Sequence, residues 1–143
     1  MTGELVRVTR PGGWVELVEP PFEIEREGPA NQRLRTFTVA LAASRGMDSG
    51  RVVFDSVDGW LGQAGLVNGA RREIGVRIGE WGGQAGSLMV SDFRAAYTRL
   101  LGAMEQRSML TAEEGRDLIL RAQEEWQHNR MLWSFAIAFG QKP

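Results

Sequence analysis

The chain has 143 residues, of which 43% are hydrophobic and 24% charged, a composition typical of a globular protein with a single domain over 1–143. The formal net charge of −1 leaves no field that recruits nucleic acid or anionic lipid, and the absence of cysteine excludes disulfides and thiolate sites. No stretch approaches the roughly 20 apolar residues of a membrane-spanning helix, and the first residues lack the apolar run of a signal peptide. We therefore expect a cytoplasmic protein without membrane or nucleic-acid partners.

A short helix and a strand are predicted first. Apolar residues before Pro11 indicate a helix that stops there, because proline ends helices. A strand follows over 14–19 with apolar residues on both faces, which predicts a sheet covered on both sides. Pro20 and Pro21 end this strand, since neither can donate a hydrogen bond to a neighbouring strand. The strand places Val15 and Leu17 on one face and Trp14 and Val18 on the other.

Two helices are predicted after a polar loop that runs to Pro29. The first covers 31–45, and the second carries an apolar stripe at helical spacing. Gly65 follows this stripe at the position of a left-handed helix cap, and Leu66 is placed to pack back against the helix. The stripe of the second helix consists of Val53, Val57, Trp60, Leu61 and Ala64.

Two further strands are predicted from alternating side chains. Over 72–79 apolar residues alternate with glycine and polar residues, which indicates a strand with one open or thinly covered face. A glycine-rich loop that contains Trp81 follows over 80–86. The last strand, over 132–139, alternates large with small residues, and the small ones would let a helix or a neighbouring backbone approach closely.

Two helices are predicted between these strands. Ser91 or Asp92 is expected to cap the first helix. Thr111 and Glu114 have the spacing of a capping box and open the second helix, which runs to about Arg130. The apolar stripe of the first helix consists of Phe93, Tyr97, Leu100, Leu101 and Met104.

Three segments of the chain resemble parts of the class I S-adenosylmethionine-dependent methyltransferases. Residues 10–19, a basic residue, a Pro-Gly-Gly turn and an apolar strand, resemble the entry to strand five of that family. Residues 78–81 resemble its turn after strand six, and residues 139–143 resemble its C-terminal tail. In this order they are similar to the C-terminal half of the subgroup with a helical insertion between strands six and seven, and the resemblance covers nearly all of the chain.

The resemblance implies an α/β fold that is part of a Rossmann-like methyltransferase domain. It implies a three-stranded mixed sheet of order five-seven-six, about four helices, and a helical insertion over 88–130. The family builds its donor site on strands one to four, so the donor-binding motifs are expected to be absent here, and the chain alone is expected to bind no cofactor and to be inactive. Residues 82–86 are not read as a nucleotide loop, because they follow a late strand and no acidic residue ends a subsequent strand.

Five residues are candidates for binding a small acceptor substrate. Glu19 ends the first strand, on the edge where open α/β sheets bind ligands, although a solvated carboxylate is the alternative. Trp81, Phe93 and Tyr97 lie on or near the insertion that roofs the acceptor site in the resembled family, and ordinary core packing is the alternative for the aromatic residues. His128 is the only histidine and could be a base or an idle residue at a helix end. We assign no catalytic residue and no metal ligand.

The strand over 14–19 is the basis for our prediction about partners. Without strand four, its apolar edge would expose unpaired backbone groups, which predicts a homodimer through this edge or pairing with a missing N-terminal methyltransferase half. Two functions therefore remain open from the sequence. The chain is the acceptor side of a methyltransferase, or it is a non-enzymatic dimeric binding or structural module derived from one.

Overall fold

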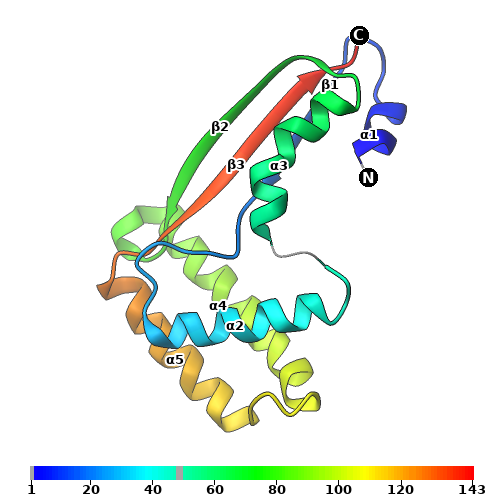
Figure 1. Cartoon of the computed structure of the whole chain (residues 1–143). Helices are drawn as coiled ribbons and strands as arrows, with labels where there is room; N and C mark the ends of the chain where they lie inside the picture. The colour runs from blue at the N-terminus through cyan, green and yellow to red at the C-terminus, as the bar shows by residue number, and fades with distance from the viewer. Residues whose placement is uncertain (1, 48–49) are drawn as a thin grey trace. The chain divides into compact units, whose positions relative to one another are not determined.

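The computed structural model describes residues 2–47 and 50–143, which form two compact units (Figure 1). The first unit comprises the described residues within 1–21, 50–75 and 134–143, and the second those within 22–49 and 76–133. The single domain expected over 1–143 remains a prediction. The elements in chain order are α1 (Thr2–Val8), β1 (Trp14–Glu19), α2 (Pro29–Ala43), α3 (Gly50–Gln63), β2 (Val67–Arg77), the 3-10 turn η1 (Glu80–Gly82), α4 (Gly83–Gln106), α5 (Ala112–His128) and β3 (Leu132–Gln141).

The three strands form one sheet of order β1-β3-β2. β1 pairs with β3 antiparallel, beginning with Trp14 opposite Gln141. β2 also runs against β3, because Asn68 near its start bonds to Gln141 while the amide of Ile78, just past its end, donates to the carbonyl of Met131. The sheet is therefore antiparallel, and the expected mixed sheet is wrong. Within the described residues the chain has five α-helices rather than about four.

The core of the first unit lies between α3 and one face of the sheet. Val15 and Leu17 of β1 are buried against Phe54, Val57 and Leu61 of α3. The small residues of β3 permit this packing, as the last strand's alternation predicted. Ala136 and Ala138 are fully buried, and a Cβ added at Gly140 would lie 2.9 Å from Cβ of Leu66.

The opposite face of β1 is open in the described structure. Trp14 is 55% exposed and Val18 is 48% exposed, so the expected cover on both faces of the sheet is wrong for this strand. The ring of Trp14 lies against that of Phe139 of β3, with ring centroids 5.9 Å apart. The apolar pattern of β1 therefore reflects a buried face and an exposed hydrophobic face.

The ends of α1 and α3 follow the local signals in the sequence. Gly65 has a φ of 82°, and the amide of Leu66 donates to the carbonyl of Leu61 over 3.2 Å, so the predicted left-handed cap is confirmed. At the same end of the sheet, the ammonium of Lys142 donates to the carbonyls of Val6 and Thr9, each over 2.8 Å. The single lysine thus stabilises the end of α1, where the exposed carbonyls favour a cation.

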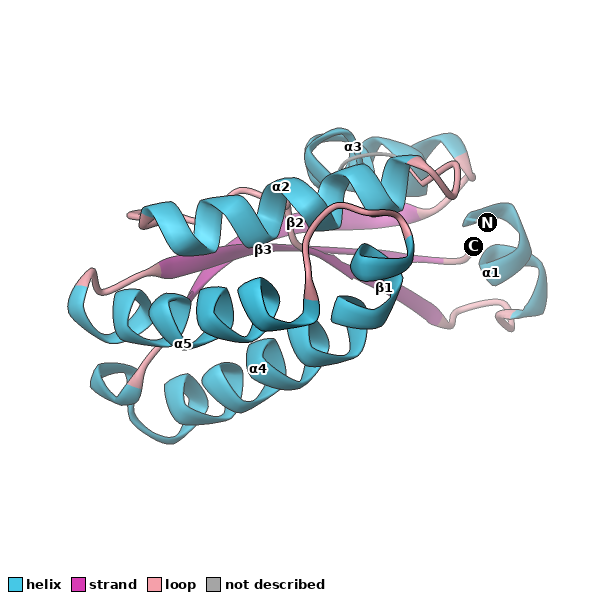
Figure 2. Cartoon of the chain, turned by 90° about the horizontal axis from the view of Figure 1, so that it is seen from below, coloured by secondary structure: helices cyan, strands magenta, loops and turns pink. Residues whose placement is uncertain are grey.

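The second unit is built from α2, α4 and α5 (Figure 2). Its core confirms the predicted stripe of α4, since Phe93, Tyr97, Leu101 and Met104 are buried. Thr111 and Glu114 form both hydrogen bonds of the capping box that opens α5, as predicted. No helix in the described part of the chain is long and apolar enough to cross a membrane.

Two predicted boundaries in the C-terminal part are wrong. β2 begins at Val67, five residues before the expected strand, and most of its residues are exposed on both faces, including Ile74 at 46%. α4 begins at Gly83, so Ser91 and Asp92 lie inside the helix instead of capping it. The loop expected over 80–86 is instead a 3-10 turn and the first turn of α4. Glycine makes this possible, because a Cβ at Gly86 would lie 2.1 Å from the carbonyl oxygen of Gly79.

Candidate functional site

An aromatic cluster lies in the second unit, at the face of α4. The ring of Phe93 lies 5.0 Å from that of Trp133, 5.7 Å from that of Trp126 and 5.9 Å from that of Tyr97, measured between centroids. Trp126 of α5 is fully buried, and Trp133 of β3 is partly buried. Offset and tilted contacts of this kind stabilise aromatic clusters beyond the area that they bury.

A cavity of about 180 Å³ opens beside this cluster, and its walls are mostly apolar. Burial raises the pKa of Tyr97 above its ordinary value. Among the described residues, no group forms a hydrogen bond with the Tyr97 hydroxyl. Every fully buried side-chain N or O atom in these residues has a hydrogen-bond partner. This hydroxyl therefore keeps some contact with solvent. The lining residues are Phe22, Ile24, Arg35, Thr38, Asp92, Phe93, Ala96, Tyr97, Leu100 and Trp133.

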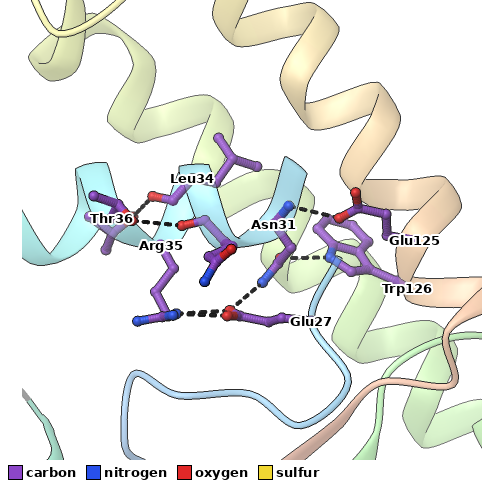
Figure 3. A network of polar contacts seen from close by, with 9 residues as sticks. Glu27, Asn31, Leu34, Arg35, Thr36, Glu125 and Trp126 are labelled. Carbon is purple, nitrogen blue, oxygen red and sulfur yellow. Dashed lines mark hydrogen bonds and ion pairs between the residues drawn. The ribbon is translucent and has the colours of Figure 1, made fainter. Parts of the chain in front are cut away.

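A network of polar contacts fixes Arg35, the cation in the cavity wall (Figure 3). Arg35 Nε donates to both carboxylate oxygens of Glu27 at 2.9 Å, and Glu27 also accepts from Nδ2 of Asn31 at 2.8 Å. The indole Nε1 of Trp126 donates to Oδ1 of Asn31 at 2.8 Å. Glu27 raises the pKa of Arg35, chiefly through this hydrogen-bonded pairing. Asn31 is fully buried, and both ends of its amide have partners.

The same network holds the start of α2 against α5. The carboxylate of Glu125 accepts hydrogen bonds from the amides of Ala30 and Asn31, each at 2.8 Å. These amides have no partner within the helix, and a carboxylate is favoured at a helix N-terminus. Gly28 leaves room for it, because a Cβ there would lie 2.2 Å from Cδ of Glu125. α2, and with it Arg35, is thereby positioned by contacts to α5.

The structure brings two of the five predicted site residues together. Phe93 and Tyr97 both line the cavity. Trp81 does not line it, so the common concavity expected for Trp81 and Tyr97 is not found. His128 is exposed at the end of α5, and Glu19 is half-buried at the end of β1, in the first unit.

The surroundings of Trp81 and His128 differ from those of an acceptor pocket. The indole Nε1 of Trp81 donates to the carbonyl of Ile78 over 2.8 Å. Nδ1 of His128 lies 2.8 Å from the carbonyl oxygen of Glu124 on its own helix. Neither residue lines the cavity beside α4.

Several residues of the cavity were not anticipated from the sequence. Phe22 and Ile24 lie in the segment expected to be a polar loop, although their alternating apolar side chains are a usable signal for a buried wall. Arg35 and Trp133 carry no local pattern that connects them to α4. They come from α2 and β3, and only the packed structure brings them to one cavity.

Three glycines of the segment after β2 are closely packed. A Cβ at Gly82 would lie 2.7 Å from Cβ of Arg77, and the glycines at 79 and 86 are similarly crowded by the chain itself, whereas a Cβ at Gly83 would have no such neighbour within 4 Å. The glycines at 79, 82 and 86 therefore serve close packing of the turn. Within the described residues no group of three or more His, Asp or Glu residues lies close enough to hold a metal ion.

Comparison with known proteins relates the chain to methyltransferases. It is 24% identical to the N-methyltransferase sirN of Leptosphaeria maculans, over 97% of this chain and 51% of that protein. The chain therefore spans about half the length of the curated relative that it matches. No protein-family profile matches the sequence.

Proposed function

We propose that this chain forms the acceptor-substrate side of a class I S-adenosylmethionine-dependent methyltransferase that methylates an amine nitrogen. The observation that carries the proposal is the similarity to an N-methyltransferase, which extends over nearly the whole chain but over only half of the relative. The aromatic cavity beside α4 would hold the acceptor. In this proposal the donor binds to polypeptide outside these 143 residues.

The strand arrangement supports this assignment. In the proposal, β1, β2 and β3 correspond to strands five, six and seven of the methyltransferase sheet. The order β1-β3-β2, with the last strand between the others and antiparallel to β1, is what this correspondence requires. The two long helices between β2 and β3, α4 and α5, would then be the helical insertion that was expected over 88–130.

The cavity has properties that suit an uncharged aromatic amine. A nitrogen accepts a methyl group through its lone pair, so it must not be protonated. Apolar walls disfavour the charged ammonium form. The Tyr97 hydroxyl can donate to or accept from the amine. A volume of about 180 Å³ is below the roughly 300–1,000 Å³ of sites for drug-sized ligands, which favours a small ring system.

Ligand binding to the cavity tests the proposal directly. By calorimetry, toluidine, which is uncharged at neutral pH, should bind with a Kd in about the millimolar range, and more tightly than phenyltrimethylammonium, which has the same ring and a permanent charge. Ala96→Phe should fill the mouth of the cavity and weaken toluidine binding by about tenfold or more, because Ala96 lines it. Ala95→Phe, on the same exposed stretch of α4 but outside the lining, is the matched control.

Two results would argue against the acceptor assignment. One is the absence of saturable toluidine binding. The other is binding that survives Ala96→Phe as well as it survives Ala95→Phe, since the ligand would then lie elsewhere.

The open edge of β1 supports a second candidate, a dimeric binding or structural module. β1 is an edge strand of the sheet, and Trp14 and Val18 are exposed on its open face. An apolar edge of this kind favours pairing with another strand, either from a second copy of the chain or from a separate methyltransferase half. In a two-fold dimer the two β1 strands would pair antiparallel and form a continuous six-stranded sheet.

Light scattering distinguishes this candidate. At about 50 µM the chain should be a dimer, and Val18→Lys should convert it to a monomer, because lysine on an edge strand disfavours pairing. Ile74→Lys is the matched control, since Ile74 is similarly exposed on β2 at the other edge of the sheet. A monodisperse monomer of the unmodified chain would exclude the dimer.

A further inference from the structure

Three arginine side chains surround Trp81 in the second unit. Their guanidinium carbons lie 6.0 Å (Arg26), 5.5 Å (Arg77) and 5.9 Å (Arg130) from the centroid of the indole ring. They come from three places in the chain: the segment before α2, the end of β2 and the turn after α5. All three arginines are exposed, and Trp81 is partly buried. We call these four residues the Trp81 cluster.

The turn around Trp81 holds the indole in one place. Its Nε1 donates to the carbonyl of Ile78 over 2.8 Å. Gly79 has a φ of 129°, and a Cβ there would lie 2.7 Å from Cδ1 of the indole, so the ring packs directly on the glycine backbone. The next amide, of Glu80, donates to Oε1 of Gln127 on α5 at 2.8 Å. The arginines therefore surround a fixed ring.

The charges of the Trp81 cluster have no ion-pair partner among the described residues. Each guanidinium is attracted by the indole ring, yet the three like charges repel one another. None of the ion pairs in the described part of the chain involves these arginines, although Glu25 and Glu80 are sequence neighbours of the cluster.

Two of the three arginines have an unusual backbone conformation. Arg26 has a φ of 58° and Arg130 a φ of 50°, in the left-handed region that residues other than glycine, asparagine and aspartate seldom adopt. Arg130 directly follows Asn129, the C-cap of α5, where a left-handed residue commonly ends a helix. The conformation of Arg26 has no such explanation, and strained residues gather at functional sites.

We propose that the Trp81 cluster is a binding site for a small multivalent anion that carries phosphoryl or carboxylate groups. Guanidinium groups bind both kinds of group through paired hydrogen bonds. Each guanidinium carbon lies within 6.0 Å of the Trp81 ring centroid, so a multivalent anion bound over the ring can interact with more than one of them. Three cations on a chain of net charge −1 favour a small anion over a polynucleotide. None of the three arginines lines the acceptor cavity, so the site is independent of the proposed methyltransferase function.

Calorimetry with pyrophosphate and with citrate, each at low and at physiological salt, tests this site and distinguishes phosphoryl from carboxylate ligands. At least one anion should bind saturably with a Kd in about the millimolar range or below, and more weakly at the higher salt. Arg26→Gln, Arg77→Gln and Arg130→Gln should each weaken binding by about threefold or more, and the triple variant should abolish it. Arg99→Gln is the matched control, because Arg99 is exposed on α4, outside the cluster.

Fluorescence supplies a second readout. Anion binding should change the tryptophan emission of the unmodified chain, and Trp81→Phe should remove this change while calorimetric binding persists. The proposal is overturned if neither anion binds saturably up to about 10 mM, or if Arg99→Gln weakens binding as much as the single substitutions in the cluster. Circular dichroism on each variant confirms that it is folded. The three single substitutions keep the proposal testable if the triple variant does not fold.

Discussion

The buried amide of Asn31 offers a sharp test of the network that positions the cavity. In Asn31→Leu a side chain of similar size replaces the amide, so the main change is the loss of its hydrogen bonds. Nε1 of Trp126 then has no acceptor in a site where Asn31 and Trp126 are both fully buried. Glu27 loses one donor and keeps Arg35.

The magnitude follows from these losses. A buried donor without a partner costs about 1–3 kcal/mol, and the loss of one donor to Glu27 costs about 0.5–1.5 kcal/mol. The better helix propensity of leucine offsets these losses by about 0.5 kcal/mol. We expect Asn31→Leu to lower the free energy of unfolding by about 1–4 kcal/mol. Gln32→Leu, one residue further along the same helix and exposed, should change it by less than about 0.5 kcal/mol.

Urea denaturation followed by circular dichroism measures both variants. A double-mutant cycle with Trp126→Phe identifies the cause. The double variant no longer contains an indole N–H without an acceptor. It should therefore be more stable, by about 1–2 kcal/mol, than the sum of the two single effects predicts. The reasoning is refuted if Asn31→Leu is as stable as Gln32→Leu, or if the two substitutions at the hydrogen bond are additive.

Two other predictions concern α4. Gly86→Ala should destabilise the protein by about 2 kcal/mol or more, because the new Cβ would lie 2.1 Å from the carbonyl oxygen of Gly79. Gly102→Ala should stabilise it by about 0.5–1 kcal/mol, because the new Cβ would have no such neighbour within 4 Å. The two variants should therefore shift the melting temperature in opposite directions. Burial raises the pKa of Tyr97, so the folded state keeps a proton that the unfolded state loses above about pH 10, and stability should fall there by up to about 1.4 kcal/mol per pH unit. Tyr97 is the only tyrosine, so tyrosinate absorbance reports its ionisation directly, and a Tyr97→Phe variant with the same loss of stability would contradict this cause.

Local signals predicted much of the fold. The glycine cap at Gly65, the capping box at Thr111 and the stripe of α4 are confirmed, because each depends on residues close together in the chain. The start of α4 was missed for the same reason. Gly82 and Gly83 resemble a loop locally, but contacts to the end of β2 make a helix start there.

The site was less accessible to sequence reasoning. Phe93 and Tyr97 were predicted as site residues and do line one cavity, whereas Trp81 was assigned to the same pocket and is instead surrounded by arginines. The hydrogen bond between Asn31 and Trp126 joins residues 95 positions apart. Periodicity describes which face of an element is apolar, and it carries no information about which distant polar groups meet.

Calorimetry of the chain with S-adenosylmethionine, and with its demethylated product, tests where the methyl donor binds. If this chain forms the acceptor side and the donor binds to polypeptide outside it, neither compound should bind saturably to the chain alone. Saturable binding at micromolar affinity would contradict this assignment, because these 143 residues would then contain a donor site of their own.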